Sequence, residues 1–367
     1  MKTDRSTRRR RPVAVAVSAL AVAALMAACG SSSVSGSGGA GSGSGSGSGG
    51  SNASGSSSAS ASSGPAKVSV VNSSFKGMTL RVGDQAGTGA QALLTSSGLI
   101  KKLPFKIQFA DFTSGPPMLQ AMSGGSLDVG GVGNAPPVFA AAGGAKIKIV
   151  GALSNNPDSA ALLVPQGSKA TSIAQLKGKK IAVAQGSSAD YHLIWALKKA
   201  GLAPNDVTLE YLQPAQALAA FSSGAVDAWD VWSPFIEQAV AQSHGRVISN
   251  GDGETANFSY LVASESALKN AATSKEITTY LKTLNQAHRW ANSHPVAWAA
   301  TWAKATGLPV SVMTKAAKDD TQTPVPVDSK ISAAEQSLVD TFSGVGLIPR
   351  HYSFAPFTSG EFNAAVS

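Results

Sequence analysis

The sequence contains few of the residues that catalytic and metal-binding proteins use. Its single cysteine is Cys29, so the chain from about residue 67 onward has none for a disulfide or a nucleophile. The histidines, at positions 192, 244, 288, 294 and 351, lack the spacing of a zinc site. No Gly-x-Ser-x-Gly nucleophile elbow is present. These absences favour a binding protein over an enzyme, and we expect neither a cofactor nor a metal ion.

Positive charge is scarcer than the net charge suggests. The formal charge is +9, from 30 lysines and arginines against 21 acids. Six of the basic residues and one acid lie in residues 1–11, so the rest of the chain carries 24 minus 20, or +4. No basic stripe with interleaved aromatic residues is present, which argues against a nucleic-acid partner.

The N-terminus reads as a targeting segment. The basic residues 1–11 precede an uncharged apolar run, residues 12–28, which is shorter than the roughly 20 residues of a spanning helix. This pattern predicts a signal peptide at 1–28. The sequence "LMAAC" resembles a bacterial lipobox, which implies that Cys29 is lipidated; a plain cleaved signal with an incidental cysteine is the alternative. Residues 29–66 are mostly Gly, Ser and Ala, which predicts a flexible tether between a membrane anchor and the body.

The body is written as two similar units about 100 residues apart. Apolar segments of strand length alternate with helical segments, which predicts an α/β fold with mostly parallel sheets. The strand "TLRVGDQ" matches "KIAVAQG", with Val82 and Val183 separated by 101 residues. Asp128 and Asp227 are separated by 99. The spacing predicts two lobes whose loops face one cleft; similarity of composition alone is the alternative.

The two matched aspartates have two interpretations. Paired carboxylates suit acid–base chemistry, but the equivalence of Asp128 and Asp227 in the repeat favours a repeated structural turn. The tryptophans Trp290, Trp298 and Trp302 lie in predicted C-terminal helices and are expected to pack in the core. These helices are expected to pack on the first lobe.

Small polar residues mark the junctions between strands and helices. Ser187 and Ser188 follow a predicted buried strand and precede a helix, whose free N–H groups suit a small anion. "GVGNAPP" and "AWDVWSPF" occupy matched positions in the two units, and Asn134 can donate from its amide. Trp229 and Trp232 are interpreted equally well as a ligand wall or as core. Gln85, at the end of the first strand, is expected to face the cleft.

Several segments resemble one known family, the substrate-binding proteins of ABC importers for aliphatic sulfonates, taurine and nitrate. They are "LRVGDQ", "FTSGPPMLQAMSGGSLDVGGVGNAPPVFAAA", "SIAQLKGKKIAVAQGSSADYHLIWALKKAGL", "VDAWDVWSPF" and "SGVGLIPRHYS". The resemblance implies a two-lobed periplasmic-binding-protein fold of type II. Lobe I would comprise residues 76–166 plus 255–367, and lobe II residues 167–254.

The resemblance also implies where a ligand would lie. The implied positions are Gln85, Ser114, Gly133, Asn134, Ser187, Ser188 and Trp229. Two departures from the family's pattern stand out: sulfonate binders of this type tend to have Asp at position 134, and they tend to have "AWxxWDP" where this chain has Asp230 and Ser233. The added carboxylate of Asp230 is expected to meet an ammonium group, such as that of taurine.

The resemblance implies an extracytoplasmic, monomeric, lipid-anchored subunit that captures a small organosulfonate and delivers it to a membrane permease. Nitrate or a pyrimidine vitamin precursor are alternative ligands. An enzyme on the same fold is a further alternative, but the desulfinases that resemble these proteins use a cysteine. A surface adhesin or receptor would not need the paired cleft loops.

Overall fold

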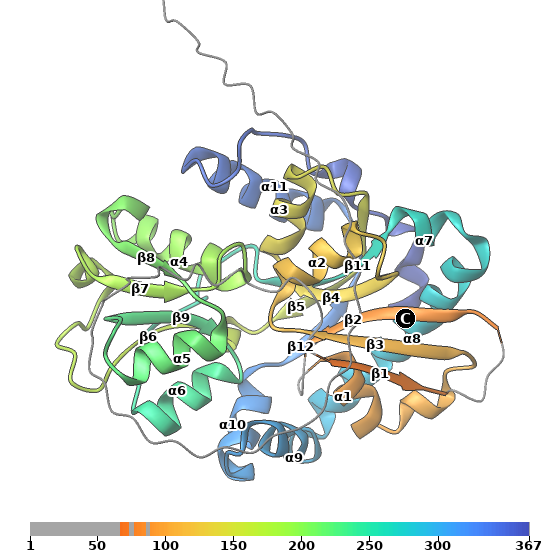
Figure 1. Cartoon of the computed structure of the whole chain (residues 1–367), viewed down its shortest axis with the longest axis horizontal. Helices are drawn as coiled ribbons and strands as arrows, with labels where there is room; N and C mark the ends of the chain where they lie inside the picture. Colours follow the sequence, from red (N-terminus) through yellow and green to blue (C-terminus); the bar gives the residue numbers. More distant parts are fainter. Residues whose placement is uncertain (1–66, 73–76, 86–88, 367) are drawn as a thin grey trace, which may run out of the picture. The chain divides into compact units, whose positions relative to one another are not determined.

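The computed structural model describes residues 67–72, 77–85 and 89–366. The predicted signal peptide, the lipidation site Cys29 and the tether at 29–66 lie outside the described residues. The described strands form two sheets, one of seven strands and one of five (Figure 1). In this part of the chain, no helix combines the length and the apolar character that crossing a membrane requires.

The seven-stranded sheet is mixed. Its order is β1-β3-β2-β4-β11-β5-β12, with β2 parallel to β3 and β4 and with β1, β11 and β12 antiparallel to their neighbours. The strands span Lys67–Val71 (β1), Thr79–Gln85 (β2), Lys106–Phe112 (β3), Val129–Gly133 (β4), Ile147–Asn155 (β5), Phe258–Ser264 (β11) and Gln322–Val325 (β12). The parallel strands end together, so their following loops share one edge of the sheet.

The five-stranded sheet repeats this parallel core. Its order is β10-β6-β9-β7-β8, with β7 parallel to β8 and β9 and with β6 antiparallel to β9 and β10. The strands span Ala160–Val164 (β6), Lys180–Val183 (β7), Thr208–Tyr211 (β8), Ala228–Trp232 (β9) and Arg246–Asn250 (β10). The fold class predicted from the sequence, an α/β protein with two similar sheets, is confirmed.

Helices cover both faces of each sheet (Figure 1). On the larger sheet, α2, α3 and α11 cover one face, while α1, α8, α9 and α10 cover the other. On the smaller sheet, α4 packs on one face, and α5 and α6 pack on the other. The helices are α1 (Ala90–Ser96), α2 (Gly115–Ser123), α3 (Ala135–Ala142), α4 (Ser188–Lys199), α5 (Pro214–Ser222), α6 (Phe235–Ser243), α7 (Glu265–Lys269), α8 (Ala271–Ser293), α9 (Pro295–Thr306), α10 (Val310–Asp319) and α11 (Ser329–Gly344).

The C-terminal helices pack on the larger sheet, as predicted. Trp298 and Trp302 of α9 are 6% and 3% exposed and share one core with strands of that sheet, and Trp290 is half-buried against it. The expectation that these three tryptophans contribute to the core is therefore confirmed, with Trp290 at its edge.

The chain passes between the sheets twice. It leaves β5 at Asn155 and enters β6 at Ala160 through the short 3₁₀ turn Pro157–Ser159. It returns between Asn250 and Phe258. The predicted end of the first segment of lobe I, residue 166, is therefore several residues late, because β6 pairs with β9 and β10. Only the single turn Pro157–Ser159 separates β5 from β6, so the sequence contains no long linker that would mark the boundary between the lobes. The remaining lobe bounds stay a proposal.

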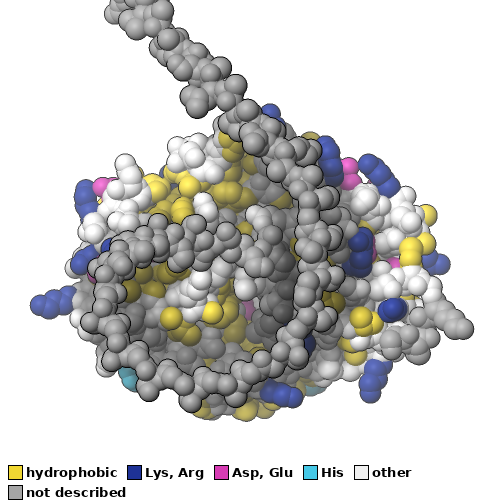
Figure 2. Space-filling view, viewed as in Figure 1, with side chains coloured by type: hydrophobic (Ala, Val, Ile, Leu, Met, Phe, Trp, Pro, Cys, Tyr) yellow, Lys and Arg dark blue, Asp and Glu magenta, His cyan; other side chains and the backbone are white. Residues whose placement is uncertain are grey.

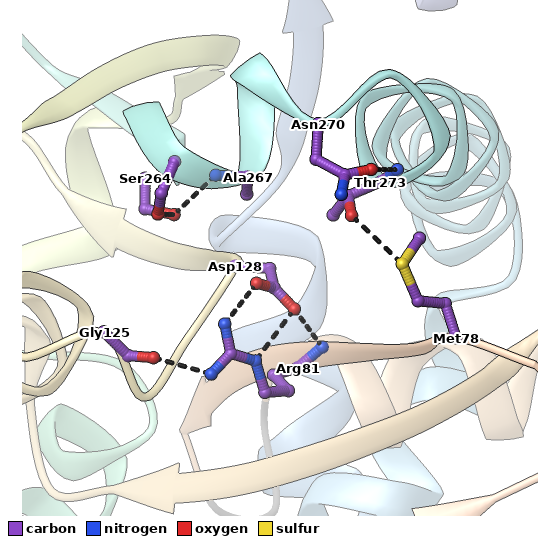
Figure 3. Close-up of polar contacts among 9 residues, drawn as sticks. Met78, Arg81, Gly125, Asp128, Ser264, Ala267, Asn270 and Thr273 are labelled. Carbon is purple, nitrogen blue, oxygen red and sulfur yellow. Dashed lines mark hydrogen bonds and ion pairs between the residues drawn. The ribbon is translucent and has the colours of Figure 1, made fainter.

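The matched aspartates form the same turn in both units. The carboxylate of Asp128 accepts the backbone N–H of Arg81 at 2.8 Å, and that of Asp227 accepts the backbone N–H of Lys180 at 2.9 Å. Each aspartate N–H donates in return to the carbonyl of the same partner. Figure 3 shows the first turn, where the Arg81 guanidinium also binds Asp128, with a shortest contact of 2.6 Å. The structural interpretation of this pair is confirmed.

Candidate functional site

A cavity of about 200 Å³ opens between the two sheets. Its lining includes five of the predicted ligand positions: Gln85, Gly133, Asn134, Ser187 and Ser188. These residues lie after or at the carboxyl ends of the parallel strands β2, β4 and β7, in the connections that lead to the next helices. The volume is several times the roughly 30 Å³ that one water molecule occupies. The cavity therefore has room for a small organic molecule as well as a bare anionic head.

The N-terminus of α4 supplies the donors that the sequence predicted. Gly186 adopts a left-handed conformation, with φ of +69°, which lets the chain turn sharply from β7 into the helix. Ser187 is the N-cap, and its oxygen accepts the N–H of Asp190 at 3.3 Å, so its hydroxyl proton remains free to donate. The hydroxyl of Ser188 lines the cavity beside it. First-turn N–H groups of a helix need an external acceptor, and an anion can provide one.

The lobes approach each other closely at this point. A Cβ added to Gly133 would lie 2.7 Å from the Ser188 Oγ and 2.8 Å from its Cβ. Real Cβ contacts essentially never fall below 3.0 Å. Glycine at position 133 therefore permits β4 and the start of α4 to meet across the cavity.

The N-terminus of α1 offers less than the sequence suggested. The Asp84 carboxylate accepts the N–H groups of Ala90 and Gln91 at 2.6 and 2.9 Å, so these donors are already used. Burial raises the pKa of Asp84 to about 7, against the lowering effect of the two N–H groups. Gln85, the residue predicted to face the cleft, does line the cavity.

Asn134 lines the cavity, but its amide N–H₂ group already donates hydrogen bonds within the protein. Its amide nitrogen donates to the Ala256 carbonyl at 2.7 Å and, more weakly, to Glu254 at 3.4 Å. Its buried oxygen has no hydrogen-bond partner among the described residues. Asn134 therefore presents an acceptor, whereas the sequence had suggested an amide donor. The first turn of the following helix also contains Pro136 and Pro137, which carry no N–H.

Trp229 is a core residue, so its predicted role as a ligand wall is wrong. It is 1% exposed and packs between Phe221 and Phe235, with ring centroids 6.0 and 6.4 Å away. The tryptophan that lines the cavity is Trp232. Trp232 is the last residue of β9, whereas Trp229 lies three residues earlier, about 10 Å back along the strand.

The predicted meeting of Asp230 with a ligand ammonium is also contradicted. Asp230 is fully buried, does not line the cavity, and contacts His192 Nδ1 at 2.8 Å. Burial lowers the pKa of His192, but the charge and hydrogen bond of Asp230 more than offset this and raise it to about 9. The carboxylate is therefore already paired inside the smaller lobe.

Ser114 joins the lobes instead of lining the cavity. It is the N-cap of α2, fully buried, and its hydroxyl donates to the Gln213 side chain at 2.9 Å. Gln213 is the N-cap of α5 and lies 99 residues later, so the two caps are equivalent in the repeat. The lobes therefore contact each other through matched positions.

Acids that sequence reasoning missed line the cavity. Glu254 comes from the return crossing, and Asp320 follows α10. Burial raises the pKa of each to about 7. No lysine or arginine lines the cavity within the described residues, and on the face shown in Figure 2 these side chains lie scattered near the edge. The same residues include no group of three or more His, Cys, Asp or Glu placed to hold a metal ion.

The two sheets, the double crossing and the cavity between them define a two-lobed binding protein of the periplasmic type. The sequence pattern of the NMT1-like family matches residues 79–305, and the chain belongs to this family. The resemblance noted in the sequence is thereby confirmed.

Relatives and solved structures agree with this assignment. The chain is 37% identical over 276 residues to a protein of Escherichia coli (strain K12) provisionally named aliphatic sulfonates-binding protein, covering 74% of this chain and 85% of the relative. The alkanesulfonate-binding protein SsuA from Xanthomonas axonopodis pv. citri, bound to MOPS, is 32% identical, with a TM-score of 0.73 over 78% of this chain and 99% of the other. The periplasmic aliphatic sulphonate binding protein SsuA of Escherichia coli is 33% identical, with a TM-score of 0.65 over 76% and 91%.

Proposed function

We propose that the protein is the substrate-binding subunit of an ABC importer and captures a small organosulfonate between its lobes. The observation that carries the proposal is the N-terminus of α4, where Ser187 and Ser188 converge on the cavity opposite Gln85. Neutral donors of this kind hold an anion well when water is excluded, without a countercharge that would retain it. The similarity to sulfonate-binding proteins supports the same class of ligand.

The proposed mechanism is hinge closure. The two crossings between the sheets are short segments at which the lobes can rotate, and a ligand that contacts both lobes favours the closed arrangement. Hydrogen bonds from Thr113 and Ser114 to Gln213 would stabilise that arrangement. The loaded protein would then deliver the ligand to its permease. In this proposal the protein is an extracytoplasmic monomer, anchored to the membrane through lipidated Cys29.

A thermal-shift screen tests the ligand. The purified protein is mixed with ethanesulfonate, taurine, nitrate or sulfate at millimolar concentration. A ligand present at 100 times its Kd stabilises the folded state by about 2.7 kcal/mol, which gives a clear rise in Tm. We expect this rise with the sulfonates, and a smaller one for a Ser188→Ala variant. No shift with any sulfonate would contradict the proposal.

A pyrimidine vitamin precursor is the second candidate ligand. Trp232, Trp298 and Trp302 are among the residues that line the cavity, and aromatic side chains are a favourable environment for a flat ring. Adding such a heterocycle to the same screen separates this ligand from a sulfonate. Nitrate is a weaker candidate, because it would leave much of the cavity unfilled.

A further inference from the structure

The donors at the start of α4 share their helical turn with a buried acid. Asp190 is in the first turn of α4, three residues after the N-cap Ser187. It is fully buried, and its Oδ2 accepts the backbone N–H of Gly186 at 2.8 Å. Its Oδ1 is buried without a hydrogen-bond partner among the described residues. One carboxylate oxygen is therefore fixed beside the proposed anion site, and the other is left unsatisfied.

The local geometry does not require a negative charge at Asp190. The side-chain oxygen of an asparagine would accept the same hydrogen bond from Gly186 without the cost of burying an ion. Burial raises the pKa of Asp190 to about 7; the Gly186 N–H opposes this rise, and the neighbouring carboxylate of Asp230 adds to it. Above that pH, a buried negative charge therefore lies beside the donors that an anion would use.

A second carboxylate approaches the same donors from the return crossing. Glu254 lines the cavity and accepts a hydrogen bond from the Asn134 amide at 3.4 Å. Asn134 directly follows the glycine that meets Ser188 across the cavity. The cation that acts on Glu254 is His192, which contacts Asp230 at 2.8 Å and is shared with that acid. Two carboxylates from different segments therefore lie near the α4 donors, while no lysine or arginine lines the cavity within the described residues.

This balance of charge suits an anion with one charge and disfavours an anion with two. Neutral N–H and O–H donors can stabilise a single negative charge, whereas each further charge is repelled by both carboxylates. We propose that Asp190 and Glu254 are specificity-determining residues that make the site reject doubly charged head groups, such as a phosphonate or sulfate dianion. The inference rests on the proposed function and adds the selection of the ligand by its charge. Repulsion of a competitor gives specificity just as added contacts to the preferred ligand do.

The expected discrimination follows from the distance between the charges. Asp190 lies in the same turn of α4 as the donors, so within about 10 Å of an anion bound there. At an effective dielectric constant of about 20, repulsion between two unit charges about 10 Å apart raises a Kd about tenfold. Glu254 lines the same cavity and should contribute a similar factor. A second charge on the ligand should therefore raise the Kd about a hundredfold in the wild-type protein.

Ethanesulfonate and ethylphosphonate test this prediction, because they share a tail and a head group with three oxygens. At pH 9 the sulfonate carries one negative charge and the phosphonate two, and this pH lies above the pKa of about 7 of both Asp190 and Glu254. Titration calorimetry of the purified protein gives the two Kd values and their ratio. Similar Kd values in the wild-type protein would overturn the inference and leave the proposed function intact. If ethanesulfonate does not bind, the proposed function fails and the inference fails with it.

Two charge-removing variants assign the discrimination to the two residues. Asp190→Asn and Glu254→Gln each keep the shape of the side chain, and each should lower the ratio of the Kd values about tenfold. Asp227→Asn is the control, because Asp227 directly precedes β9 and so lies at the opposite end of that strand from Trp232, which lines the cavity. The control should keep the wild-type ratio. A variant of Asp190 or Glu254 that weakens both ligands equally has damaged the site without changing its selectivity, and would overturn the role of that residue.

Discussion

A single methyl group at Gly133 should disfavour the closing of the lobes on a ligand. The Cβ of Gly133→Ala would lie 2.8 Å from the Ser188 Cβ, which is fixed to the backbone and cannot rotate away. Ordinary contact begins near 3.4 Å, so the two lobes must separate by about 0.6 Å at this point. Gly133 does not have a positive φ, so alanine is compatible with the backbone itself.

The magnitude follows from the cost of overpacking. Forcing an extra methyl into a packed contact costs about 1–3 kcal/mol, which corresponds to about a 5- to 150-fold loss of affinity. The unliganded protein can relieve the clash by opening, so its unfolding midpoint should stay at the wild-type value. Titration calorimetry with ethanesulfonate measures the affinity, and circular dichroism measures the melting. Gly167→Ala is the control, since its methyl would meet no atom within 4 Å.

A double-mutant cycle tests the reasoning directly. Ser188→Gly removes both atoms that the new methyl would meet, and the next atom, the Ser188 nitrogen, is 3.8 Å away. The Gly133→Ala change should therefore cost little affinity in a Ser188→Gly background, even though that background has lost a hydroxyl donor. If Gly133→Ala binds ethanesulfonate like the wild type, or weakens both backgrounds equally, the contact does not control closure.

Two further predictions concern stability. Asp230→Asn leaves His192 without its buried charged partner and should lower the free energy of unfolding, measured in urea, by about 3–5 kcal/mol. The control Asp227→Asn should change it by less than about 1 kcal/mol. Similar losses in the two variants would show that the buried pair does not stabilise the fold. Stability should also fall steadily between pH 5 and pH 9. Folding raises the pKa of Asp84 and of Asp190 from 3.8 to about 7, and that of His192 from 6.5 to about 9. Across this range the folded protein therefore holds protons that the unfolded chain has released, so a rise in pH favours unfolding. Denaturation across this range checks the sign, and a rising profile would contradict it.

The repeat made much of the fold predictable. Matched spacing of strands and helices is enough to place two parallel cores, because each strand-to-helix handover recurs about 100 residues later. The turn at Asp128 and Asp227 could be interpreted as structural from its equivalence alone. Ser187 and Ser188 could be placed in the cavity for a similar reason, since they directly follow the end of a parallel strand.

The choice between Trp229 and Trp232 was within reach of the sequence. Residues that face a ligand lie at the carboxyl ends of strands, and Trp232 is the position matched to Gly133 by the 99-residue spacing. Trp229 falls three residues earlier, inside the sheet. Applying the repeat to each residue of the motif, and not just to its start, would have selected Trp232.

No pattern in the sequence identifies His192 as the partner of Asp230. His192 lies 38 residues away on α4, and their contact depends on how α4 packs over β9. An acid within a buried strand indicates that some partner exists, since a lone buried charge is costly. The sequence does not say whether that partner is a ligand or a side chain. The fold answers the question by placing His192 on the facing helix.

Charge in the cavity cannot be inferred from charge in the chain. The body carries a formal +4, yet Asp84, Glu254 and Asp320 line the cavity, and no lysine or arginine lines it within the described residues. These acids come from three distant segments, β2, the return crossing and the residue after α10, and line one cavity only when those segments are assembled. The charge of the cavity is therefore a property of the assembled fold, which the sum of charges over the sequence does not reveal.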